Sequence, residues 1–104
     1  MKKILVVDDS SVDLKNLERI VSDAGALVIT ATSGAEALEK ARENKPALIM
    51  LDVNMPGIDG FSTARQLASD PSTKGIPVVF VTSKNQRADR VFAQMLGAKG
   101  YVTK

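Results

Sequence analysis

Short apolar runs alternate with segments of helical periodicity along the whole chain, and this alternation restricts the fold more than any other feature. The apolar runs are rich in β-branched residues, as buried strands are, and they are Ile4–Val7, Leu27–Ile29, Ala47–Leu51, Val78–Val81 and, more weakly, Tyr101–Val102. Strands that alternate with helices are joined by crossover connections and form a parallel sheet with helices on both faces. The sequence therefore predicts a doubly wound α/β domain.

The segments between these runs carry apolar residues spaced three and four apart, which places them on one helical face. Four helices are predicted from the apolar positions 14, 17, 21 and 24, then 35, 38 and 41, then 61, 64 and 67, then 88, 91, 92 and 95. Ser10 or Ser11 can cap the first helix and Ser33 the second, while Gly25 stands where a left-handed residue ends the first. The sequence ends at Lys104, directly after the fifth run, so we expect no fifth helix.

Histidine and cysteine are both absent, which excludes whole classes of chemistry. Without cysteine there is no disulfide, thiol nucleophile or cysteine zinc site, and without histidine there is no Ser-His-Asp triad or imidazole catalysis. Any chemistry must come from carboxylates, amines and hydroxyls.

Charge and hydropathy limit the partners of the chain. Fourteen Lys and Arg residues are scattered among 12 acidic residues, with a net charge of +2 and no basic run, so no direct contact with nucleic acid is implied. The apolar stretch after Lys3 is too short for a signal peptide, and no run approaches the roughly 20 residues of a membrane span. We expect one cytoplasmic domain over residues 1–104 without membrane insertion.

Polar side chains directly follow four of the predicted strands, and they are Asp8 with Asp9, Asp52, Thr82 with Ser83, and Thr103 with Lys104. Any one of these would be read alone as a turn, a helix cap or a solvated charge. However, the carboxyl ends of parallel strands share one edge of the sheet, where ligands bind, so four together favour a functional site.

Three carboxylates at one edge repel one another unless a cation neutralises them. Ligands that are all oxygen favour a hard cation, and Mg²⁺ is usually held by one or two carboxylates, waters and a substrate phosphate. The pattern thus predicts phosphoryl chemistry. Asp52 could attack phosphorus, while Thr82 and Lys104 could contact a phosphoryl oxygen.

Five stretches, in this order and at this spacing, match a known family, and they are residues 4–10, 31–38, 51–60, 77–83 and 97–104. The chain resembles the receiver domain of two-component response regulators over nearly its whole length. The resemblance implies a flavodoxin-like fold with strand order 2-1-3-4-5. Residues 60–84 are also similar to chemotaxis-type regulators of type IV pilus twitching motility.

The resemblance implies that Asp52 accepts a phosphoryl group from the phosphohistidine of a sensor histidine kinase. Asp9, Asp52 and the backbone carbonyl of Asn54 would hold Mg²⁺, and Asp8 would bind the ion mostly through water. Such a chain is not an enzyme acting on a separate substrate, although it catalyses its own phosphorylation and dephosphorylation.

The remaining residues implied by the resemblance couple the site to the surface. Lys104 would pair with the acidic cluster and the phosphoryl oxygen. Thr82 would move to hydrogen-bond that oxygen and Tyr101 would turn inward, so that the two act as a switch for a downstream protein target. Family members continue with a proline and a fifth helix, so we expect a truncated chain that covers its bare sheet face by self-association.

Three alternatives remain open from the residues alone. A haloacid-dehalogenase-type phosphatase also phosphorylates an Asp after a strand, but it needs a DxD pattern that Asp8-Asp9-Ser10 lacks. A flavodoxin-like FMN binder needs a phosphate-binding loop at the start of the first helix, where Asp8 and Asp9 would repel phosphate unless a metal intervened. Gly57 and Gly60 belong to no known phosphate-loop pattern. A degenerate receiver that acts only as an interaction module is the third.

Overall fold

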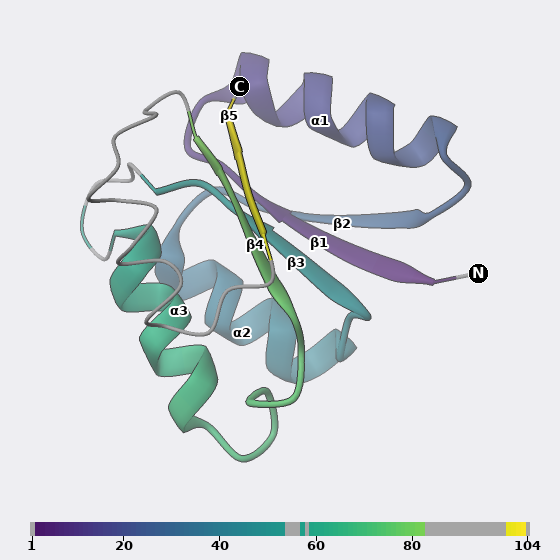
Figure 1. The fold of residues 1–104 in the computed structure, drawn as a ribbon. Coiled ribbons are helices and arrows are strands. Elements are labelled where there is room, and N and C mark those ends of the chain that lie inside the picture. The colour runs from purple at the N-terminus through teal and green to yellow at the C-terminus, as the bar shows by residue number, and fades with distance from the viewer. Residues whose placement is uncertain (1, 54–56, 58, 83–99, 104) are drawn as a thin grey trace.

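The computed structural model describes residues 2–53, 57, 59–82 and 100–103 (Figure 1). Within them the elements follow the order β1 (Lys3–Val7), α1 (Ser11–Asp23), β2 (Leu27–Ala31), α2 (Gly34–Asn44), β3 (Leu48–Leu51), α3 (Gly60–Ser69), β4 (Val78–Thr82) and β5 (Gly100–Thr103). All strand pairs are parallel, and the sheet has the order β2-β1-β3-β4-β5. The predicted flavodoxin-like α/β fold is confirmed. The helix predicted around residues 88–95 lies outside the described residues.

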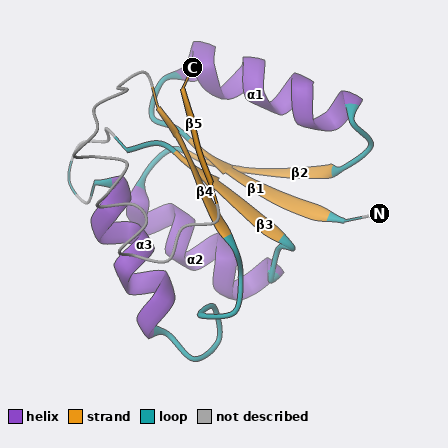
Figure 2. Cartoon of the chain, viewed as in Figure 1, coloured by secondary structure: helices purple, strands orange, loops and turns teal. Residues whose placement is uncertain are grey.

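The order of the strands places β1 and β3 next to each other near the middle of the sheet. Leu5 pairs with Ile49 and Val7 with Leu51, so both strands end at the same level. In Figure 2, α1 lies on one side of the sheet and α2 and α3 lie on the other. The residues that follow β1 and β3 therefore emerge side by side at one edge.

Local capping explains where the first two helices begin and end. The Ser10 hydroxyl accepts from the backbone N–H of Asp13, and the Ser33 hydroxyl accepts from Glu36 N at 3.1 Å. Gly25, which follows the C-cap Ala24 of α1, has a φ of 95°, and this confirms the predicted left-handed position. The left-handed residue after α2 is Lys45, with a φ of 47°. Sequence patterns did not indicate Lys45, because glycine or asparagine normally occupies such a position.

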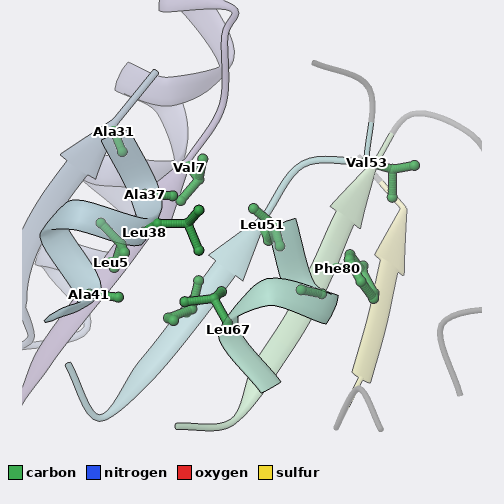
Figure 3. Packing of buried hydrophobic residues seen from close by; sticks show 12 residues of the cluster. Leu5, Val7, Ala31, Ala37, Leu38, Ala41, Leu51, Val53, Leu67 and Phe80 are labelled. Atoms are coloured by element: carbon green, nitrogen blue, oxygen red, sulfur yellow. The ribbon is translucent and has the colours of Figure 1, made fainter. Parts of the chain in front are cut away.

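The core lies between the sheet and the pair α2 and α3 (Figure 3). The strands contribute every second side chain to it, and these are Leu5, Val7, Ala31, Ile49, Leu51 and Phe80. Phe61 and Phe80 meet edge to face, with ring centroids 5.0 Å apart. The two rings thus belong to the core, and α3 packs against the sheet through them.

The opposite face of the sheet is less completely covered. Val6 is fully buried there, whereas Ile4, Leu48, Met50 and Val79 are half-buried. Burial on both faces was predicted for all the apolar runs, and it holds for the middle of β1 but not for β3. Among the described helices, α1 alone lies on this face, over β1 and β2 (Figure 1).

No helix in the described ranges is long and apolar enough to span a membrane.

Candidate functional site

Three carboxylates gather at the edge of the sheet where β1 and β3 end. Asp8, Asp9 and Asp52 each offer a carboxylate oxygen, and these oxygens all lie within 4.8 Å of one another. The convergence expected from the strand ends is therefore present. Residues more than 40 positions apart in the sequence meet because β1 and β3 are hydrogen-bonded neighbours.

Backbone hydrogen bonds fix the positions of two of these residues. The N–H of Asp52 donates to the Val7 carbonyl oxygen at 2.9 Å, and the N–H of Asp8 donates to the Ala31 carbonyl oxygen at 3.1 Å. Both bonds continue the ladders of the parallel sheet by one residue beyond the strands. The sheet itself thus places the two carboxylates next to each other.

The three carboxylates differ in their surroundings. Asp8 is fully buried and Asp52 is only 5% exposed, whereas Asp9 is exposed to solvent. An oxygen of Asp8 accepts a hydrogen bond from the backbone N–H of Ser10 at 3.0 Å. The cluster therefore combines two buried carboxylates with one that is exposed to solvent.

The donor set fits a hard divalent cation. Three negative charges at this spacing repel one another, and in a sheltered setting water screens that repulsion only in part. All the candidate ligand atoms are carboxylate oxygens, which suit Mg²⁺ better than softer metals. Asp8, Asp9 and Asp52 are thus the described residues that would hold such an ion.

The other predicted site residues are only partly described. The backbones of Thr82 and Tyr101 lie in the neighbouring strands β4 and β5, where Tyr101 pairs with Phe80 and Thr82 with Thr103. Their side chains, together with Asn54 and Lys104, lie outside what the structure describes. The roles of these residues stay predictions.

Sequence reasoning missed one residue beside the cluster. Gly60 begins α3, is buried, and donates its backbone N–H to the Val53 carbonyl oxygen at 2.9 Å. In the sequence Gly60 ends the matched stretch 51–60 and belongs to no phosphate-loop pattern, and neither feature indicates a packing role. Its one recognisable signal is its place directly after Asp59, whose side chain caps α3 by accepting from Ser62 N at 2.8 Å.

Comparison with known proteins gives a consistent result. The family model described as "Response regulator receiver domain" matches residues 4–104. Protein PilH of Pseudomonas aeruginosa is 39% identical over 104 residues, which are 100% of this chain and 86% of PilH. Response regulator PleD of Caulobacter vibrioides is 42% identical over 102 residues, which are 98% of this chain but only 22% of PleD.

Solved structures agree with the sequence matches. The chemotaxis protein CheY4 of Vibrio cholerae has a TM-score of 0.94 and 33% identity, and the match covers 100% of this chain and 87% of that one. A phosphatase of the haloacid-dehalogenase type and a flavin-binding module are not favoured by these matches. The chain belongs to the family of response regulator receiver domains.

Proposed function

We propose that Asp52 is the phosphoacceptor of this receiver domain and that Asp8 and Asp9 complete the Mg²⁺ site. Receiver domains take phosphoryl groups from histidine kinases and act on downstream targets. The observation that supports the assignment is the cluster of Asp8, Asp9 and Asp52, with oxygens within 4.8 Å of one another at the ends of adjacent strands.

Asp52 suits the role of nucleophile because of its position. Its backbone is fixed to β1 through the Val7 carbonyl, and the residue is 5% exposed, so few waters compete for an incoming phosphorus. A carboxylate oxygen of Asp52 forms the new P–O bond while the P–N bond of the donor phosphohistidine breaks. The imidazole then leaves and takes a proton from solvent.

Asp8 and Asp9 have different roles in holding the cation. Asp8 is buried and oriented by the N–H of Ser10, so it is a fixed negative charge, whereas the exposed Asp9 can rotate to meet an ion arriving from solvent. When bound, Mg²⁺ would neutralise the carboxylates and the phosphoryl oxygens, which would otherwise repel the incoming donor. The Asn54 carbonyl is the proposed additional ligand.

The remaining assignments follow the family. Lys104 would contact the phosphoryl oxygen, and Thr82 with Tyr101 would report phosphorylation to a downstream protein. A sensor histidine kinase is the proposed donor, and catalysis by the chain of its own phosphorylation and dephosphorylation belongs to the same proposal. A cytoplasmic location and a part in twitching motility stay predictions.

Incubation with acetyl phosphate, with and without Mg²⁺, tests this function without a partner protein. We expect intact-mass measurement to find one added phosphoryl group only when Mg²⁺ is present. Equal phosphoryl uptake in excess EDTA would show that phosphorylation does not need Mg²⁺ and would contradict the metal part of the proposal. No uptake under either condition, from a chain shown to be folded, would contradict phosphoacceptance itself.

A further inference from the structure

The first residue of α3 packs directly on the backbone of the proposed phosphoacceptor. A β-carbon built on Gly60 would lie 2.1 Å from the carbonyl oxygen of Asp52, 2.7 Å from Val53 Cα and 2.9 Å from the carbonyl carbon of Asp52. Each of these contacts is closer than 3.0 Å, below which real β-carbons essentially never approach another atom. All three atoms belong to the backbone, so no side-chain rotation can relieve the overlap.

Gly60 differs in this respect from four other glycines in the described part of the chain. Gly25, Gly57 and Gly75 have nothing within 4 Å of such a β-carbon, and Gly100 would only touch the Val79 side chain at 3.4 Å. Gly25 and Gly57 have positive φ angles, which explains glycine there, but Gly60 does not. Close approach to the Asp52–Val53 segment is therefore what requires glycine at position 60.

Both sides of this contact are fixed. On one side, Asp52 N–H is bonded to Val7 O in the sheet. On the other, Gly60 N–H is bonded to the Val53 carbonyl oxygen at 2.9 Å, and Phe61 of α3 meets Phe80 of the sheet edge to face. The first turn of α3 is closed by Thr63, whose N–H and hydroxyl donate to Asp59 O at 2.9 and 2.8 Å. The Asp52–Val53 segment thus lies between β1 and a firmly anchored helix start.

We propose that Gly60 is a positioning residue that sets where the Asp52 carboxylate lies relative to Asp8 and Asp9. A β-carbon at position 60 and Asp52 O would have to separate by more than 1 Å to reach ordinary contact, and because Phe61 and Leu67 pack α3 against the sheet, the separation displaces Asp52. A displacement of that size can lower a reaction rate by about 100-fold. The inference rests on the proposed role of Asp52.

The main test compares Gly60→Ala with Gly75→Ala. Alanine favours helix formation over glycine, so without the close contact Gly60→Ala would raise the melting temperature. We expect instead that folded Gly60→Ala binds Mg²⁺ about 10- to 100-fold more weakly by calorimetry at low temperature, with an equal or greater loss in the rate of phosphorylation by acetyl phosphate. Gly75→Ala should match the parent in both.

A second pair keeps the test decisive if Gly60→Ala does not fold. Thr63 and Thr73 are both buried, and each hydroxyl donates to a backbone carbonyl oxygen. The Thr63 hydroxyl donates to Asp59 O at 2.8 Å, and the Thr73 hydroxyl donates to Leu67 O at 2.7 Å. Valine removes each bond at nearly constant volume. We expect Thr63→Val, beside the site, to weaken Mg²⁺ binding by the folded protein, and Thr73→Val, beyond the far end of α3, to lower only the stability.

The outcomes separate the two proposals. If the parent neither binds Mg²⁺ nor accepts a phosphoryl group, the proposed function fails. If the parent does both and folded Gly60→Ala has the same Mg²⁺ affinity and rate, only the positioning role of Gly60 is wrong. If Gly60→Ala does not fold, equal Mg²⁺ affinities for the two threonine variants overturn the inference.

Discussion

The backbone N–H of Asp52 donates to the carbonyl oxygen of Val7 at 2.9 Å, which places the Asp52 carboxylate beside that of Asp8. The bond belongs to the ladder between β1 and β3, so the acidic cluster is built by the same hydrogen bonds that build the sheet. The carboxylates are therefore close together before any cation arrives. Their mutual repulsion acts on the folded chain and not on the unfolded one.

Asp9→Asn should raise the stability of the metal-free protein and weaken its affinity for Mg²⁺ at the same time. Removing one exposed charge from the cluster relieves repulsion of about 0.5–1 kcal/mol, which raises the melting temperature of a domain this size by a few degrees. Loss of a hard oxygen ligand lowers the Mg²⁺ affinity. Thermal melts with and without Mg²⁺ check both effects.

Glu39→Gln, on the exposed surface of α2, is the matched control and should change neither quantity. An Asp9→Asn protein whose melting temperature without Mg²⁺ is unchanged or lowered would argue against repulsion within the cluster.

Thr82→Ala should accept a phosphoryl group almost as well as the parent but should not transmit the change to the surface. The proposed coupling requires two states that differ in the contact between the Thr82 hydroxyl and the phosphoryl oxygen. Beryllofluoride with Mg²⁺ serves as a phosphoryl mimic in an NMR titration. We expect smaller shifts around Tyr101 in the variant, and equal shifts in both proteins would show that Thr82 is not the switch.

Asp70 links the ends of α2 and α3 and gives a stability contribution that depends on pH. The hydrogen bond from Arg42 Nε at 2.8 Å, followed by two from Ser72, lowers the pKa of Asp70 from 3.8 to about 2. Because the pKa is lower in the folded state, the stabilisation is present above the unfolded value and is lost as the pH falls from 3.8 towards 2.

Asp70→Asn should therefore melt below the parent by the same margin at pH 7 and at about pH 5, and the margin should shrink between pH 4 and pH 2. Paired melting curves over this range measure it. A margin at pH 2 as large as that at pH 7 would mean that the ionised carboxylate is not what stabilises the loop.

The order of elements could be predicted from the sequence because each run has one periodicity. Ile4–Val7 is a short β-branched run, Leu14, Leu17 and Val21 are spaced as on one helical face, and Ser33 is a cap of ordinary type. The left-handed Lys45 could not be predicted, since its conformation depends on how α2 meets the following segment. The half-burial of Met50 likewise depends on what lies over that face of the sheet.

The acidic cluster could be predicted because it follows from topology alone. Carboxylates directly after two adjacent parallel strands must meet once the strand order places β1 beside β3. The contact between Gly60 and Asp52 depends on how α3 packs against the end of β3. That packing is a tertiary feature, and its only trace in the sequence is a glycine. The sequence therefore indicated Asp52 as a member of the acidic cluster, but it did not indicate the close contact at Gly60.

Self-association through the half-buried sheet face stays a prediction, and the structure suggests a direct test. Met50 and Val79 pair across β3 and β4 on that face, so a polar side chain there should weaken any dimer. Light scattering at micromolar concentration should show a larger mass for the parent than for Met50→Gln. Val12→Gln, on the exposed side of α1, is the control and should match the parent. A monomeric parent would overturn the prediction.

The identity of the phosphoacceptor is tested most directly by intact mass after incubation with acetyl phosphate and Mg²⁺, for the parent, Asp52→Asn and Asp59→Asn. Asp59 is the nearby cap of α3, and asparagine caps a helix as well as aspartate does, so this control changes a charge without changing the fold. We predict one added phosphoryl group on the parent and on Asp59→Asn and none on Asp52→Asn. An Asp52→Asn protein that gains one phosphoryl group as fast as the parent would contradict the assignment.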